Sequence, residues 1–174
     1  MPIVPDTKDW TWVLERSCGE CGFDPEQFHR SLTASAIREN AVAWALILKR
    51  DDVMVRASDD RWSDLEYACH VRDVYRIFDQ RLAAMLAEDN PMFENRDQDA
   101  SAVLDRYDLQ DPGVVSRELL LAAENYADRF DSVRKIEWTR PGTRSNGSHF
   151  TVETLAIYGL HDCSHHVWDV TSTR

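Results

Sequence analysis

Three histidines in this sequence of 174 residues have the spacing that a metal-binding site requires. His161 and His165 are four residues apart, and on an α-helix this spacing places both rings on one face. His70 lies on an apolar stripe, because Val74 and Ile77 follow it four and seven residues later. Neutral imidazole is a common ligand of divalent cations. We therefore predict that His70, His161 and His165 hold one ion inside the protein.

Three histidine ligands would leave coordination positions open for water or substrate, and zinc, nickel, iron or manganese could occupy such a site. An ion of this kind lowers the pKa of a water or thiol, or polarises a carbonyl group. Glu66 and Asp73 flank His70, and we expect either of them to accept a hydrogen bond from its second ring nitrogen. The alternative interpretation is that the histidines are core or surface residues without a ligand role.

Two cysteines near the N-terminus, in the segment Cys18-Gly-Glu-Cys21, form half of a zinc knuckle. A structural zinc needs four ligands, and the sequence contains no second Cys-x-x-Cys motif. The alternatives are a second metal site completed by folding, a redox pair, or two reduced thiols in a turn, and we expect the last. The residues that folding could add as further ligands are His29, Cys69, Cys163 and His166. We interpret Cys69 and Cys163 as packed thiols rather than nucleophiles.

The composition describes an acidic globular protein, with 43% apolar and 29% charged residues, a net charge of −11 and a pI of about 4.9. An acidic surface repels phosphate, so we expect no nucleic-acid partner and no anionic membrane surface. The sequence contains no apolar run of 18 residues and no signal peptide at its start. We therefore expect a cytoplasmic protein with reduced cysteines.

The segments that position these residues have mostly helical patterns. Asp-Pro pairs at 24–25 and 111–112 are typical helix starts, and Asn90-Pro91 is a stop signal. The expected helices cover residues 24–49, 60–88, 111–130 and 151–170. This pattern predicts an all-α fold, a four-helix bundle forming one domain over residues 1–174.

The connecting segments are less regular. Residues 91–111 form a long polar connection between the second and third helices, with one short helical turn expected at 102–107. We expect 133–138 to be extended and 140–147 to be a turn. Residues 1–24 are irregular, and the neighbouring Trp10 and Trp12 indicate a lid packed on the bundle.

One histidine in the second helix followed by His-x-x-x-His in the fourth resembles the DinB/YfiT-like metalloenzyme superfamily of damage-inducible helical bundles. The resemblance covers roughly residues 24–172. The local sequence is similar to actinobacterial members, of the mycothiol-dependent maleylpyruvate isomerase type, in four segments. They are Asp6-Thr-Lys-Asp-Trp-Thr-Trp12, Cys18-Gly-Glu-Cys-Gly-Phe23, Arg38-Glu-Asn-Ala41 and Arg144-Ser-Asn-Gly147.

The resemblance implies a bundle in which His70, His161 and His165 bind the metal, with zinc the expected ion for a thiolate. It also implies a thiol S-transferase or isomerase that uses a low-molecular-weight thiol, here mycothiol, and an electrophilic substrate. In that interpretation the metal stabilises the thiolate, which attacks the electrophile. No motif identifies catalytic residues. Arg72 and Arg144 are candidates by position, with a surface role as the alternative for each.

Two further functions remain open at the level of sequence. One is a non-catalytic, stress-related bundle that binds metal, as a monomer or a homodimer. The other is a metal-dependent hydrolase that uses bound water. An open metal site beside a large cleft favours the thiol enzyme, an occluded site favours the non-catalytic protein, and a small cleft with a carboxylate near the water favours the hydrolase.

Overall fold

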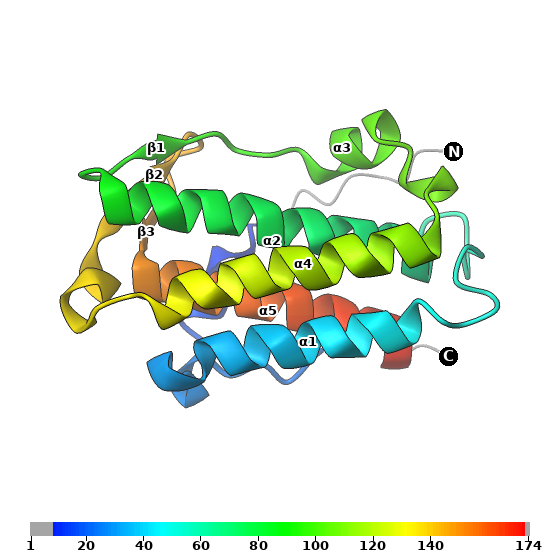
Figure 1. The fold of residues 1–174 in the computed structure, drawn as a ribbon, viewed down its shortest axis with the longest axis horizontal. Coiled ribbons are helices and arrows are strands. Elements are labelled where there is room, and N and C mark those ends of the chain that lie inside the picture. The colour runs from blue at the N-terminus through cyan, green and yellow to red at the C-terminus, as the bar shows by residue number, and fades with distance from the viewer. Residues whose placement is uncertain (1–8, 173–174) are drawn as a thin grey trace.

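In a computed structural model that describes residues 9–172, four long helices pack side by side (Figure 1). This arrangement confirms the predicted all-α four-helix bundle. The four helices are α1 (Thr33–Ile47), α2 (Asp64–Ala87), α4 (Pro112–Asp131) and α5 (Val152–Ser172). The shorter helical segments are α3 (Gln98–Leu104) and the 3-10 turns η1 (Trp10–Leu14), η2 (Pro25–Gln27), η3 (Arg30–Leu32), η4 (Tyr107–Leu109) and η5 (Lys135–Thr139). Within residues 9–172, no helix combines the length and hydropathy that a membrane span requires.

The helix starts follow local capping chemistry. Asp111 caps α4 by accepting a hydrogen bond from the backbone N–H of Val114. Ser63 begins α2 with a capping box, in which Ser63 and Glu66 satisfy each other's backbone N–H groups. The prediction that the first helix runs continuously from residue 24 is wrong. Asp24 starts only the short turn η2, and the extended backbone at His29 (φ −128°, ψ 120°) separates it from α1.

The direction of the helices explains the long connection. In Figure 1, α2 and α4 run the same way along the bundle, while α1 and α5 run the opposite way. The chain must therefore return along the whole length of α2, about 36 Å at 1.5 Å per residue, before α4 can start. The segment with β1 and α3 makes this return across α2 (Figure 1). Helices α2 and α1 each pack against both α4 and α5.

A small sheet closes one end of the bundle. It has the order β1–β2–β3, with β1 (Met92–Phe93) parallel to β2 (Pro141–Arg144) and β2 antiparallel to β3 (His149–Thr151). The predicted turn at 140–147 is thus a hairpin that includes strand β2, and Gly147 adopts the positive φ of 92° that the turn requires. The extended segment predicted at 133–138 is wrong, because residues 135–139 form the 3-10 turn η5.

One buried carboxylate ties the long connection to the bundle. Asp73 on α2 is 7% exposed and accepts hydrogen bonds from the hydroxyl of Tyr107 at 2.5 Å, from Arg96 at 3.0 Å and from Arg72 at 2.9 Å. Burial acts to raise the pKa of Asp73, but these hydrogen bonds and the positive charges beside it bring that pKa below its usual value. The ionised carboxylate therefore fixes the course of residues 96–107 across α2.

Helices α2 and α5 approach closely where they carry the candidate site residues. Gly159 on α5 faces α2, and a Cβ atom at this position would lie 2.9 Å from Cδ1 of Phe78 and 3.3 Å from the hydroxyl of Tyr126. A larger residue would force the two helices apart. The spacing between the site residues on α2 and those on α5 therefore depends on this glycine.

We predict that Asp73→Asn lowers the free energy of unfolding by about 1.5–3 kcal/mol, since it removes the carboxylate that binds the buried Arg72 and the half-buried Arg96. Urea unfolding followed by circular dichroism measures this change. Asp108→Asn is the matched control, because its ion pair with Arg106 is exposed, and we expect it to cost less than about 0.5 kcal/mol. Equal effects of the two substitutions would contradict a central role for Asp73.

Candidate functional site

The structure divides the three predicted ligands between two groups of side chains. His161 and His165 lie together with Cys18 and Cys21, and His70 lies with Asp162 and His166. Within each group, one ligand atom per residue lies within 4.8 Å of every other. That His70, His161 and His165 bind one ion remains a prediction. The geometry favours two separate sites.

Helix α5 produces both groups because it carries two pairs of residues at the same spacing. His161 and His165 form one i, i+4 pair, and Asp162 and His166 form a second pair offset by one residue. One residue corresponds to about 100° of rotation around a helix. The first pair therefore faces the N-terminal segment, and the second faces α2.

The distances in the group around His70 suit a metal ion. His70 Nε2 lies 3.4 Å from Oδ1 of Asp162, and His166 Nε2 lies 3.7 Å from the same oxygen. Two ligand atoms bound at about 2.1 Å to a tetrahedral ion are about 3.4 Å apart. Nitrogen and oxygen ligands of this kind are those of zinc and other first-row divalent cations. We call His70, Asp162 and His166 the His2Asp group.

Buried polar atoms in this group approach one another but form no hydrogen bond with the described residues around them. Within the described residues, both ring nitrogens of His70 and Oδ1 of Asp162 are buried without a hydrogen bond. Such atoms cost free energy unless something else satisfies them. Burial lowers the pKa of His70, so its imidazole is neutral at neutral pH, as a metal ligand must be. For Asp162, burial raises the pKa, but His70 and His166 outweigh it and bring that pKa to about 2. The donor set fits a divalent cation.

A second carboxylate orients His166. Nδ1 of His166 lies 2.9 Å from Oδ2 of Asp169, so a proton on Nδ1 would be held by Asp169 and the lone pair of Nε2 would be available to an ion beside Asp162. Histidine ligands in metal sites commonly have such a partner. The expectation that Glu66 or Asp73 would orient His70 is wrong. Glu66 is engaged with Arg56 and with the start of α2, and Asp73 is engaged in the arginine cluster described above.

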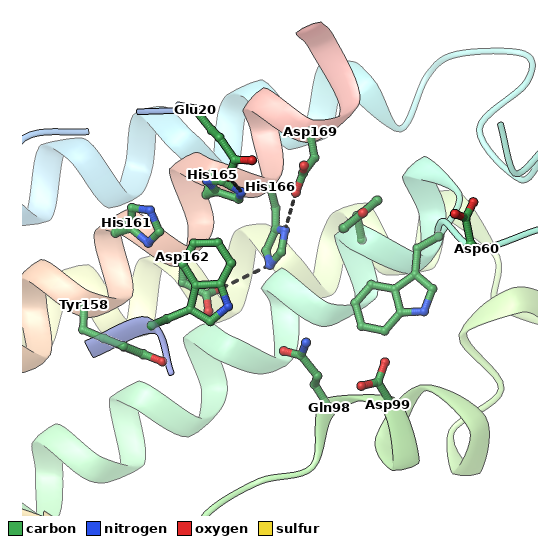
Figure 2. A pocket seen from close by; sticks show the side chains of 13 residues that line it. Glu20, Asp60, Gln98, Asp99, Tyr158, His161, Asp162, His165, His166 and Asp169 are labelled. Atoms are coloured by element: carbon green, nitrogen blue, oxygen red, sulfur yellow. Dashed lines mark hydrogen bonds and ion pairs between the residues drawn. The ribbon is translucent and has the colours of Figure 1, made fainter. Parts of the chain in front are cut away.

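A cavity of about 330 Å³ is lined by Asp162 and His166 of the His2Asp group and also by His161 and His165 (Figure 2). Its aromatic walls are Trp10, Trp62, Tyr67 and Tyr158, and its carboxylates are Glu20, Asp60, Asp99, Asp162 and Asp169. No lysine or arginine is among the described residues that line it. A volume of this size holds a small organic molecule. The carboxylates favour a neutral or cationic group in this cavity over an anion.

A smaller cavity of about 100 Å³ lies on another side of His70 and Asp162, and it is basic. Arg81 and Arg144 line it, and Arg81 donates a hydrogen bond to the backbone carbonyl oxygen of Glu94 at 2.9 Å instead of to a carboxylate. Aromatic rings hold both guanidinium groups in place. Arg81 lies 5.2 Å from the ring of Phe78, and Arg144 lies 5.7 Å from the ring of Tyr158. Arg81 is 7% exposed, and burial lowers its pKa to about 10.

The sequence also contains a spacing pattern for Asp162 and His166, which were not predicted as ligands. Asp162 and His166 have the same four-residue spacing as the chosen pair, and an aspartate is an ordinary metal ligand. Only the rotation of α5 against α2 determines which pair meets His70. The structure also brings Cys18 and Cys21 to His161 and His165, and neither histidine was among the candidates for completing the knuckle. Arg144 faces a cavity, whereas Arg72 is paired with Asp73.

Comparisons with known proteins support the fold. No family model matches the sequence, and no curated protein matches it. The structure is similar to that of YfiT from Bacillus subtilis, with a TM-score of 0.73 over 82% of this chain and 84% of the other, at 18% sequence identity. YfiT is described as a probable metal-dependent hydrolase with an unusual four-helix bundle topology. The chain therefore has the four-helix-bundle fold of YfiT.

Proposed function

We propose that this protein is a metal-dependent hydrolase whose ion is held by His70, Asp162 and His166. The observation that carries the proposal is the convergence of two imidazoles and one carboxylate beside a cavity of about 330 Å³. Two histidines and one carboxylate form the ligand set of many catalytic zinc sites, which keep a position open for water or substrate. The description of YfiT, a protein of the same fold, as a probable metal-dependent hydrolase supports this proposal.

A divalent cation in such a site supplies Lewis acidity, which lowers the pKa of a water or thiol and polarises a carbonyl group. The residues of the chain have complementary roles. His70 and Asp162 approach from α2 and α5, and Asp169 keeps the lone pair of His166 directed into the site. Aromatic side chains on the cavity wall provide an apolar surface against which a substrate could pack beside the ion.

The basic cavity supports a substrate with an anionic group. A buried arginine without a carboxylate partner is costly, and an anionic ligand removes that cost. Arg81 and Arg144 line the same small cavity as His70 and Asp162, so an anion bound there would be next to the ion. We infer that these two arginines hold a carboxylate or phosphate of the substrate, while its neutral part occupies the larger cavity.

A second candidate is a thiol S-transferase or isomerase that uses a low-molecular-weight thiol such as mycothiol. The larger cavity favours it, because aromatic rings pack on the C–H faces of sugars and carboxylates accept hydrogen bonds from their hydroxyl groups. In this case the thiol would replace water as the nucleophile, and the arginines would bind an anionic electrophile. The same ligands serve both functions, so the nucleophile distinguishes them.

We predict that zinc-loaded wild type hydrolyses 4-nitrophenyl acetate or 4-nitrophenyl phosphate. His166→Ala should lower this activity at least about 100-fold and should bind one ion fewer per chain. Elemental analysis and hydrolysis rates on the same samples measure both. His149→Ala is the control, since this exposed histidine on β3 lies outside both groups. Turnover that requires added mycothiol would support the second candidate, and a wild type with no metal at His166 would refute both.

We predict that Asp169→Asn weakens zinc binding about 10–100-fold, because the partner of His166 no longer carries a charge. Competition with a chromophoric chelator measures this affinity. Asp60→Asn is a matched control, since Asp60 lines the same cavity but bonds to Ser58 instead of His166. Equal affinities of the two variants would argue against His166 as a ligand.

We predict that Arg81→Gln weakens the binding of succinate to zinc-loaded protein about 10–100-fold, the range expected for loss of a charged hydrogen bond. Calorimetric titration measures the binding. Arg76→Gln is the control, because Arg76 lies on the same helix but bonds to Asp73 and Glu118. If both variants bind succinate as wild type does, the small cavity is not an anion site.

A further inference from the structure

We propose that Cys18, Cys21, His161 and His165 form a second metal site, a closed structural zinc centre that fastens the N-terminal segment to α5. None of its ligands belongs to the His2Asp group, so it stands independently of the proposed hydrolase. We call this set the Cys2His2 group.

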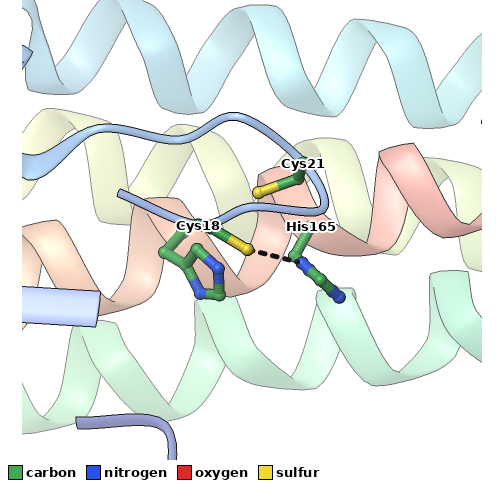
Figure 3. Close-up of side chains that lie close together, drawn as sticks. Cys18, Cys21 and His165 are labelled. Atoms are coloured by element: carbon green, nitrogen blue, oxygen red, sulfur yellow. Dashed lines mark hydrogen bonds between the residues drawn. The ribbon is translucent and has the colours of Figure 1, made fainter. Parts of the chain in front are cut away.

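The spacing and the distances in this group are those of a tetrahedral zinc site. The two cysteines are separated by two residues and the two histidines by three, as in Cys2His2 zinc sites. Sγ of Cys18 lies 3.7 Å from Nδ1 of His165, although the two residues are 147 positions apart (Figure 3). A sulfur and a nitrogen bound to one tetrahedral zinc ion are about 3.6 Å apart.

The backbone around the cysteines has a tight turn that presents both thiols to one point. The N–H of Gly22 donates to the carbonyl oxygen of Cys18 at 3.0 Å, and the N–H of Cys18 donates to that of Phe23 at 2.8 Å. Gly22 adopts a positive φ of 74°, which side chains other than glycine rarely tolerate. Both thiols are free rather than joined in a disulfide. The turn therefore holds two sulfur ligands ready beside α5.

The histidines of this group are also prepared for a metal. Nε2 of His161 is buried and, within residues 9–172, has no hydrogen-bond partner. Nε2 of His165 lies 3.6 Å from a carboxylate oxygen of Glu20, which belongs to the cysteine turn itself. That carboxylate can accept the proton of Nε2 and leave Nδ1 free to face Cys18, as in many histidine–metal sites.

The ligand set determines the kind of site. Four protein ligands fill a tetrahedral zinc ion and leave no position for substrate, which distinguishes this group from the three-ligand His2Asp group. Thiolates are soft ligands that favour zinc over magnesium, calcium or manganese. Two thiolates also balance the charge of a divalent ion, so the buried centre is neutral overall.

A zinc ion here would also shape the cavity of the first site. Trp10 packs 5.1 Å from the ring of His165, and Phe23 packs 5.5 Å from the ring of His161, so the N-terminal segment surrounds the histidines. Trp10 and Glu20 from this segment line the larger cavity. The structural ion therefore holds one wall of the cavity in place.

Elemental analysis of protein purified without a histidine tag tests the proposal. We expect two ions per chain in wild type, one in Cys21→Ser and one in His166→Ala. Cys69→Ala is the matched thiol control, because Cys69 is buried outside the group, and it should keep both ions. After cobalt(II) replaces zinc, a thiolate-to-cobalt charge-transfer band should be present in His166→Ala and absent in Cys21→Ser.

Two further results on wild type do not depend on the folding of a variant. Iodoacetamide should modify Cys18 and Cys21 only after a chelator removes the zinc, and hydrogen exchange of residues 10–24 should then rise at least tenfold. A disulfide between these cysteines in protein purified under reducing conditions would overturn the proposal. Cobalt-loaded wild type without the charge-transfer band would overturn it too. A wild type that carries a single ion, lost both in Cys21→Ser and in His70→Ala, would overturn it as well. A wild type with one ion, kept in His166→Ala and lost in Cys21→Ser, would refute the hydrolase but leave this site intact.

Discussion

The position of α5, packed between α2 and the N-terminal segment, is the constraint on which both candidate sites depend. Gly159 sets how closely α5 approaches α2, because any side chain there would meet Phe78. At this separation Asp162 reaches His70 from one side of α5, while His161 and His165 turn toward the cysteines on another. A small rotation or displacement of α5 would change the ligands of both groups at once.

The buried charged and polar side chains fall into two kinds, those with charged partners in the protein and those without. The buried carboxylate of Asp73 has arginines and a tyrosine as partners and stabilises the fold. In contrast, the buried His70 lies 3.4 Å from the half-buried Asp162, and the buried Arg81 donates to the backbone carbonyl oxygen of Glu94 instead of to a carboxylate. All three side chains line one small cavity. Unsatisfied buried polar groups are costly, so their concentration at one place is a sign of ligands and not of stability.

The two cavities beside the His2Asp group have opposite charge, and this difference bears on substrate choice. Carboxylates and aromatic rings line the larger cavity, and arginines held over aromatic rings line the smaller one. A molecule with a neutral, hydroxyl-rich part and an anionic end would match both. Asp162, one of the proposed ligands, lines both cavities, so in the proposed hydrolase a bond joining the two parts would lie near the ion.

The sequence by itself determined the bundle, because helix capping residues and apolar periodicity are local properties. The start of α4 at Asp111-Pro112 and the long connection before it were predicted for this reason, whereas the sheet and η5 depend on contacts distant in the chain. The His-x-x-x-His spacing also indicated α5, the helix on which four of the candidate ligands lie. Only the tertiary structure decided how ligands group, since His161 and Asp162 are neighbours in sequence but differ by about 100° around the helix. Which of them meets His70, and which meets Cys18 from the far end of the chain, depends on packing that no local pattern encodes.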